Sequence, residues 1–242
     1  MIKDDQVTLD LSIKKRFHSK NYQLIKMIGQ GGFGIVYKAR QISTDQIVAI
    51  KFLTLSSEFD SNKRERYLER FQRETALSSR LQHPNIVRLL DKGVCDDDLV
   101  YAVFEYVDGK SLKQHLSEKG ALLPADTANL MGQVLDALSH AHAQGVIHRD
   151  LKPANIMLSR VGTKDHIKIL DFGIGTLSNE VRQHDYKSIT LTHETLGTPS
   201  YSAPEQLRGE SPSIKSDIYV WGLVFIECLT GQPAITGNSL AS

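Results

Sequence analysis

The chain has 242 residues and a formal net charge of +1, so its bulk electrostatics give no reason to expect nucleic acid or a membrane surface as a partner. Hydrophobic residues make up 40% and charged residues 24%, an ordinary globular balance that argues against disorder. The length suits one large domain or two lobes, with a substantial core in either case.

The first residues carry charges and lack an apolar core, so they do not predict a secretory signal. Residues 1–20 are expected to form an N-terminal extension. Val7, Leu9, Leu11 and Ile13 alternate with polar residues, which fits a short edge strand and a frayed tail equally well. No stretch approaches the roughly 18 to 20 apolar residues of a membrane helix, so no membrane segment is expected.

Two cysteines, Cys95 and Cys228, are far apart in the sequence. This favours buried free thiols over a disulfide or a metal site, and it predicts a reducing, cytoplasmic location.

A glycine-rich segment covers Gly29–Gly34 with the spacing G-x-G-x-x-G. The spacing alone is a weak signal, because dinucleotide-binding folds also use it. Those folds need a helix directly afterwards, whereas Ile35–Tyr37 favours a strand and Ile47–Ile50 predicts another, which ends at Lys51. A glycine loop between two strands lets backbone N–H groups approach nucleotide phosphates without Cβ collisions.

Four longer elements follow from composition and periodicity. Helix formers predict a helix from about residue 62 to 81, and an apolar run predicts a buried strand over 99–107. Helical spacing predicts amphipathic and core helices over about 125–143 and 217–229, the second ending at Gly231. His140 and His142 lie two residues apart on the first of these helices, so they do not share a face and do not favour a metal site.

The richest stretch is Ile147–Asn155, which places an acid, a base and an amide within nine residues. A second acid follows in Asp171-Phe172-Gly173, after one short apolar segment. Such residues can transfer a phosphate between oxygens with the help of magnesium.

These motifs resemble the catalytic loop and metal-binding motif of protein kinases. Val48–Lys51 is similar to the third-strand motif of that family, and Ala203–Glu205 is similar to the motif that ends its activation segment. The chain most resembles the bacterial eukaryotic-like Ser/Thr protein kinases. The resemblance implies an α+β, bilobal fold, with an antiparallel sheet and one helix in an N-lobe over residues 21–107. A mostly helical C-lobe over residues 108–242 is expected to be incomplete after its central helix.

The resemblance also implies catalytic roles. Asp150 would accept the proton of the substrate hydroxyl, and Lys152 would stabilise the moving phosphoryl group. Asn155 and Asp171 would hold magnesium ions, and Asp217 would brace the backbone of the catalytic loop. Lysine at position 152 is typical of the Ser/Thr branch.

For the nucleotide, the resemblance implies that Lys51 contacts the phosphates and pairs with Glu74, and that Phe104 lies behind the adenine. The nucleotide-binding residues expected in this way are Ile28, Gly29, Gln30, Gly31, Gly32, Phe33, Gly34, Val36, Ala49, Lys51, Phe104, Glu105 and Val107.

A long segment rich in hydroxyl groups separates Asp171 from the Ala203–Glu205 motif. In kinases with an arginine before the catalytic acid, as Arg149 is here, a phosphorylated residue of this segment pairs with that arginine. Thr176 stands where some relatives carry a second basic partner, which is a departure from the pattern. The phosphorylation sites expected, in order, are Thr192, Thr190 and Thr195.

The sequence therefore predicts transfer of the γ-phosphate of ATP to Ser/Thr hydroxyls of proteins, with Mg²⁺ as the metal and Mn²⁺ able to substitute. Autophosphorylation by a second copy in trans is also expected. The alternative is a pseudokinase, a nucleotide-binding scaffold without turnover, although Lys51, Asp150 and Asp171 are all present. A small-molecule phosphotransferase is disfavoured by the Ala203–Glu205 motif and the long segment before it.

Overall fold

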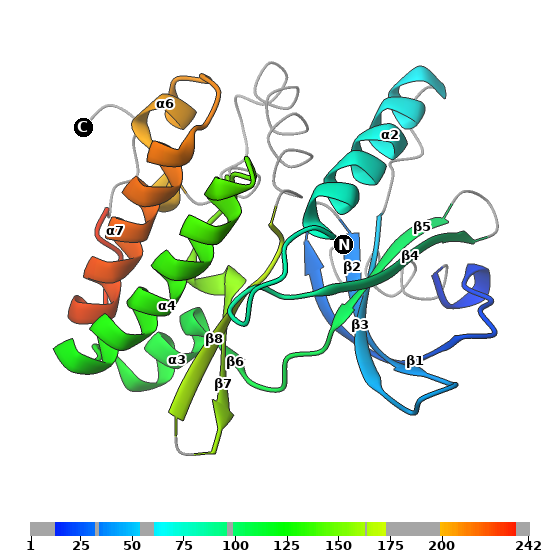
Figure 1. Cartoon of the computed structure of the whole chain (residues 1–242), viewed down its shortest axis with the longest axis horizontal. Coiled ribbons are helices and arrows are strands. Elements are labelled where there is room, and N and C mark those ends of the chain that lie inside the picture. The colour runs from blue at the N-terminus through cyan, green and yellow to red at the C-terminus, as the bar shows by residue number, and fades with distance from the viewer. Residues whose placement is uncertain are drawn as a thin grey trace, which may run out of the picture. The chain divides into compact units, whose positions relative to one another are not determined.

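The computed structural model describes residues 13–31, 34–53, 61–95, 99–162, 164–172 and 199–235. The chain divides into two compact units, Met1–Ser79 with Arg88–Tyr106 and Arg80–Val87 with Val107–Ser242. The first unit contains an antiparallel sheet and a helix, and the second contains mainly helices with a small sheet (Figure 1). This content confirms the predicted α+β class.

The sheet of the first unit has five strands in the order β1-β2-β3-β5-β4. Their bounds are Tyr22–Gly31 for β1, Gly34–Gln41 for β2, Ile47–Phe52 for β3, Leu89–Cys95 for β4 and Leu99–Glu105 for β5. Helix α2 spans Ser61–Ser78. The predicted order of strand, glycine loop and strand is therefore confirmed, and the predicted strand over 99–107 ends at Glu105.

One face of this sheet forms the apolar core of the unit. Alternate residues of β2 and β3, such as Tyr37, Ile50 and Phe52, are fully buried because successive side chains of a strand point to opposite faces. Phe17 joins this core and packs edge-on against Phe52 and Tyr101, with ring centroids 4.9 and 5.3 Å apart.

At Ile13 the extension before β1 differs from both alternatives that the sequence allowed, a short edge strand and a frayed tail. Residues 13–16 form one helical turn, and Ile13 is 1% exposed. Residues 13 and 17 lie four apart, so a helical turn brings both apolar side chains to the same core. Val7, Leu9 and Leu11 lie outside the described residues.

The two edge strands of this sheet, β1 and β4, are joined by a side-chain contact. The Tyr22 hydroxyl donates to Asp91 Oδ2 at 2.8 Å. Burial and this bond raise the pKa of Tyr22. A contact between opposite edges requires strong curvature of the sheet.

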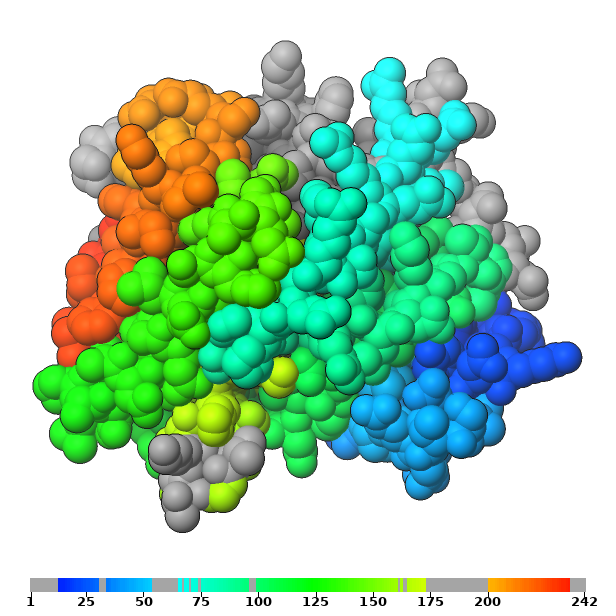
Figure 2. Space-filling view, in the orientation of Figure 1, coloured from blue at the N-terminus to red at the C-terminus, as the bar shows by residue number. Residues whose placement is uncertain are grey.

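The second unit is built around two neighbouring helices. Helix α4 (Pro124–Ala143) packs along α7 (Ile214–Thr230), as their surfaces show in Figure 2, and Trp221 Nε1 donates to Met131 O at 2.9 Å. Both helices match their predictions. Helix α7 is capped by Gly231, which has the left-handed φ of 73° that glycine accepts readily.

The remaining elements of this unit are short. They are β6 (Lys110–Ser111), α3 (Leu112–Lys119), η2 (Pro153–Asn155), β7 (Ile156–Val161), β8 (Lys164–Ile169), η3 (Pro199–Tyr201) and α6 (Pro204–Leu207). The small sheet has the order β6-β7-β8. Among the helices described here, none is both long and apolar enough to cross a membrane.

The two cysteines are free thiols, as predicted. Cys228 is buried on α7, and burial raises the pKa of its thiol to about 12. Cys95, at the end of β4, is only partly buried, which corrects the expectation for that residue.

Candidate active site

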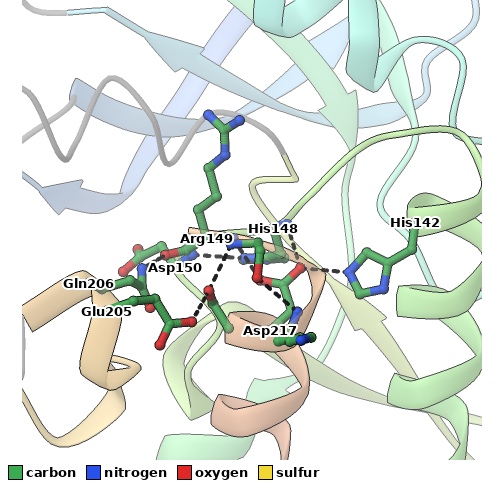
Figure 3. Close-up of polar contacts among 10 residues, drawn as sticks. His142, His148, Arg149, Asp150, Glu205, Gln206 and Asp217 are labelled. Atoms are coloured by element: carbon green, nitrogen blue, oxygen red, sulfur yellow. Dashed lines mark hydrogen bonds and ion pairs between the residues drawn. The ribbon is translucent and has the colours of Figure 1, made fainter. Parts of the chain in front are cut away.

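The backbone of the loop between α4 and β7 is held by a buried carboxylate. Asp217, on the first turn of α7, accepts hydrogen bonds from His148 N at 2.8 Å and from Arg149 N at 2.9 Å, one on each oxygen. The side chain of Asp217 is 2% exposed. Figure 3 shows it beneath the loop. The predicted bracing role of Asp217 is confirmed.

His142 is a second partner of Asp217. Its Nε2 lies 2.8 Å from Asp217 Oδ2, near the C-terminal end of α4 (Figure 3). The sequence did not predict this role, although His142 lies four residues after the buried Leu138 and so on the inner side of the helix. The histidine therefore helps to hold the carboxylate that holds the loop.

The carbonyl of Arg149 is fixed from another direction. Arg149 has a left-handed φ of 71°, and its carbonyl oxygen accepts from Gln206 Nε2 at 2.9 Å. Gln206, labelled in Figure 3, in turn accepts from Ala203 N at 3.0 Å. A non-glycine residue in this region costs free energy and persists only where its surroundings hold it in place. Gln206, which sequence reasoning missed, is part of that support.

The segment containing Gln206 is tied to α7 as well. The Ser216 hydroxyl donates to Glu205 Oε1, and this bond lowers the pKa of the Glu205 carboxyl. The first turn of α7 therefore contacts both the loop between α4 and β7, through Asp217, and α6, through Ser216.

Three predicted catalytic residues lie together within the loop. Lys152 Nζ is 2.8 Å from Asp150 Oδ2, and both side chains are partly exposed, at 25% and 22%. Asn155 Nδ2 donates to Asp150 O at 2.8 Å and lies 3.3 Å from Asp150 Oδ2. A cation and an amide thus flank one carboxylate oxygen of Asp150.

Asp171 is brought to this cluster through the residue before it. Leu170 N donates to Asn155 O at 2.8 Å, and Leu170 O lies 2.8 Å from His148 Nε2. Because Asp150 N donates to His148 Nδ1 at 3.3 Å, Nε2 is the nitrogen that carries hydrogen toward Leu170. Asp171 itself has a left-handed φ of 60°.

The oxygen atoms of this cluster suit a magnesium ion. Asn155 uses its Nδ2 on Asp150, which leaves Oδ1 as the atom able to ligate a cation, and Asp171 supplies a carboxylate. Mg²⁺ prefers such oxygen ligands and usually completes its shell with waters and phosphate oxygens. The described residues contain no group of three or more His, Cys, Asp or Glu side chains that could hold a metal by themselves.

Several nucleotide-binding candidates share one face of the sheet in the first unit. Val36 pairs with Lys51, and Ala49 pairs with Phe104, across neighbouring strands. Cross-strand partners lie on the same face, as do residues two apart in one strand. Val36, Ala49, Lys51 and Phe104 therefore lie on the face opposite the apolar core, and Lys51 is largely buried there.

The glycines of the loop differ in what they allow. Gly34 has φ 141°, and an added Cβ would lie 1.8 Å from Phe52 O, so packing of β2 on β3 itself requires glycine. At Gly29 the nearest atom to an added Cβ is Val36 Cβ at 3.9 Å, an ordinary contact. Gly29 is therefore not required by the packing of this unit.

The other predicted residues fall into two groups. Ile28, Gln30 and Gly31 lie in β1, Val107 follows β5, and Glu105 accepts from Arg88 N at 2.8 Å. Glu74 lies in α2, but its side chain is outside the described residues. Gly32, Phe33, Thr190, Thr192 and Thr195 are also outside them.

Comparison with known proteins identifies the family. A family model for the protein kinase domain matches residues 22–241. This chain belongs to the protein kinase family. The match confirms the predicted kinase fold, and kinases of this family in general use ATP and a divalent metal on protein substrates.

The kinase is also similar to curated bacterial proteins. It is 41% identical over 224 residues to serine/threonine-protein kinase PrkC of Bacillus subtilis, covering 93% of this chain and 32% of the relative. It is 42% identical over 213 residues to pkn3 of Myxococcus xanthus, covering 87% and 38%. It is 37% identical over 227 residues to PknB of Mycobacterium leprae, covering 93% and 35%. The kinase chain thus spans about a third of the length of these relatives.

Proposed function

We propose that this chain is a serine/threonine-protein kinase domain that transfers the γ-phosphate of ATP to protein hydroxyls. The observation that carries the proposal is the cluster of Asp150, Lys152 and Asn155, with the backbone of Leu170, the residue before Asp171, bonded to Asn155. Asp217 holds the backbone just before this cluster. Mg²⁺ is the metal proposed, with Mn²⁺ able to substitute, because the available ligands are carboxylate and amide oxygens.

In the proposed reaction, Asp150 orients the substrate hydroxyl and takes its proton as the oxygen bonds to the γ-phosphorus. The bond between that phosphorus and the β-phosphate oxygen breaks, and ADP leaves with the electron pair. Lys152, 2.8 Å from Asp150, stabilises the negative charge of the moving phosphoryl group. Bound magnesium, held by Asn155 and Asp171, would neutralise phosphate charge.

Mainly residues of the first unit would hold the nucleotide. Lys51 would contact the phosphates, and Val36, Ala49 and Phe104 would face the adenine ring, with the backbone of residues 105–107 bonding its edge. The shared face of these side chains supports this assignment. Catalysis is then mainly positioning and charge neutralisation, which suits a reaction with little covalent chemistry for the protein to perform.

Serine and threonine are the acceptors proposed, because Lys152 matches that branch and the similar proteins are named serine/threonine kinases. The kinase would phosphorylate a second copy of itself in trans at Thr192, Thr190 or Thr195, and Arg149 would pair with the phosphate. Free thiols at Cys95 and Cys228 support a reducing, cytoplasmic location.

The pseudokinase alternative has no supporting observation, since the lysine and both acids that such proteins commonly lose are present.

The test is incubation with Mg²⁺ and γ-labelled ATP, together with matched peptides that differ only in a Ser, Thr or Tyr acceptor. Asp171→Asn is the control, because it keeps the size of the side chain and removes its charge. We expect phosphate on the Ser and Thr peptides with the parent, and mass spectrometry should find it on the chain's own threonines. Transfer to the Tyr peptide alone, or equal transfer by the control, would contradict the proposal.

A further inference from the structure

Strand β8 is an outer strand of the small sheet, yet its outer edge is hydrogen-bonded. The sheet order is β6-β7-β8, so no further strand in the described part of the chain pairs with that edge. Instead, Val87 N donates to Ile169 O at 2.9 Å and Ile169 N donates to Asn85 O at 2.8 Å. Ile86 and Ile169 form an isolated parallel bridge, so the segment Arg80–Val87 runs beside the end of β8 (Figure 1).

Farther along the same edge of β8, beyond the segment Arg80–Val87, the hydrogen bonds come from the Gln133 side chain of α4. Its Oε1 accepts from Ile167 N at 3.2 Å, and its Nε2 donates to Asp165 O at 3.2 Å. A side-chain amide carries the same donor and acceptor as a peptide group, so it can replace a missing strand at two residues of β8. Gln133 thus supplies the hydrogen bonds that an edge strand otherwise leaves to water.

Gln133 is also bonded to the neighbouring segment. Its Oε1 accepts from Asn85 Nδ2 at 2.9 Å, and the same Nδ2 donates to Ile167 O at 2.9 Å. One glutamine therefore joins α4, β8 and the segment Arg80–Val87. Removing its amide would release two backbone groups of β8 and one partner of Asn85 together.

The strand held in this way leads directly to the metal-binding candidate. Asp171 follows Ile169 by two residues, and the residue between them, Leu170, is bonded on both sides, to Asn155 and His148. The backbone between the Gln133 contacts and Asp171 is therefore hydrogen-bonded along most of its length. A shift of β8 would be passed to the Asp171 carboxylate.

We propose that Gln133 is a positioning residue for Asp171, acting through β8. The inference rests on the proposed function, because it takes the Asp171 carboxylate as a ligand of magnesium. A purely structural glutamine would contribute to folding stability without affecting how the protein responds to the metal.

The first readout is hydrogen exchange at the Ile167 amide, followed by NMR. In Gln133→Met the side chain keeps its approximate size and loses the amide, so we expect exchange about tenfold faster, as the loss of one hydrogen bond implies. Gln133→Glu keeps an oxygen that can accept from Ile167, so its exchange should stay near that of the parent. Gln144→Met, an exposed glutamine just after α4, is the matched control and should not change it.

The second readout is the Mg²⁺ concentration at which a non-hydrolysable ATP analogue binds to half saturation. We expect that midpoint to rise about three- to tenfold in Gln133→Met, since a displaced ligand weakens metal binding as the outer-shell partners of metal sites do. It should stay within about twofold in Gln133→Glu and in Gln144→Met. Faster exchange with an unchanged midpoint in Gln133→Met would overturn the inference and leave Gln133 a structural residue.

This experiment separates the inference from the proposed function. If the parent binds the analogue in a Mg²⁺-dependent way, shows the expected shift in Gln133→Met and yet transfers no phosphate, the proposed function fails and the inference stands. If the parent transfers phosphate and Gln133→Met keeps the parent's midpoint, the inference alone fails.

Discussion

Val36, Ala49 and Lys51 in the first unit are placed by strand register, with an apolar core behind them on the opposite face of the same strands. Asp150 and Asp171 in the second unit lie on irregular backbone, and hydrogen bonds from distant residues hold that backbone in place. A packed sheet spreads its support over many contacts. A polar network depends on a few atoms, so a single substitution in it should cause a larger loss of stability.

The largest effect is expected at Asp217. Asp217→Ala leaves the buried N–H groups of His148 and Arg149 without their acceptor and removes the partner of His142. We expect the free energy of unfolding to fall by about 3–5 kcal/mol, the range for breaking a buried charged contact. Denaturant titration measures it. Asp217→Asn keeps one acceptor oxygen, so its free energy of unfolding should fall less. A fall below about 1 kcal/mol in Asp217→Ala would contradict the claim that the polar network depends on a few atoms.

In the first unit, Phe17→Ala tests how much stability the apolar core loses on a single substitution. Phe17 packs edge-on against Phe52 and Tyr101 and is 8% exposed, so its removal should cost about 3 kcal/mol of unfolding free energy. Because the nucleotide candidates lie on the other face of the sheet, ATP affinity of the folded variant should stay within about twofold. A parent-like stability would show that the segment before β1 is not part of the core.

The glycine loop offers a matched pair. Gly34→Ala places a Cβ against Phe52 O at a backbone angle that alanine rarely adopts, so unfolding free energy should fall by about 2 kcal/mol. Gly29→Ala meets only an ordinary contact with Val36 and should change stability by less than about 1 kcal/mol. Its effect should appear instead as weaker nucleotide binding. Equal stability losses in the two variants would contradict this division of roles.

The smallest effect concerns pH and Glu227 on α7, which accepts from the Tyr201 hydroxyl at 2.6 Å. Burial raises the pKa of Glu227, and the bond from Tyr201 opposes that shift. A raised carboxyl pKa contributes stability that is fully present below the ordinary value of an unfolded glutamate and is lost as pH rises through the folded value.

Glu227→Gln cannot titrate and should therefore lack this loss. Unfolding titrations from about pH 4 to about pH 7 should show the variant gaining stability relative to the parent as pH rises. Tyr201→Phe removes the hydrogen bond that lowers the pKa of Glu227. The loss of stability with rising pH should therefore occur at higher pH than in the parent. A difference between Glu227→Gln and the parent that does not depend on pH would rule out titration of this carboxyl.

Local composition and residue spacing explain most of what the sequence predicted correctly. β-forming residues marked β2 and β3, the glycine spacing marked the loop between β1 and β2, and an apolar run ending at Gly231 marked α7. Each of these signals is contained within one element.

The polar contacts could not be predicted from such local signals. His142 and Asp217 are 75 residues apart, and Gln206 and Arg149 are 57 apart, so no local pattern pairs them. Gln133 lies beside the apolar stripe of α4, which marks it as a boundary residue without naming its partners on β8. The edge strand that the sequence allowed near Ile13, as one of two alternatives, is wrong for the same reason, because the core that buries Ile13 and Phe17 comes from distant strands.

The most direct test of the kinase assignment is the rate of phosphate transfer by Asp150→Asn relative to the parent, with nucleotide affinity and unfolding midpoint measured on the same samples. Asp150 is the proposed acceptor of the substrate proton, so transfer should fall by about 10²- to 10⁴-fold, the usual contribution of a positioned acid or base. Nucleotide affinity and the unfolding midpoint should stay close to those of the parent. Equal transfer rates in the two proteins would contradict the assignment.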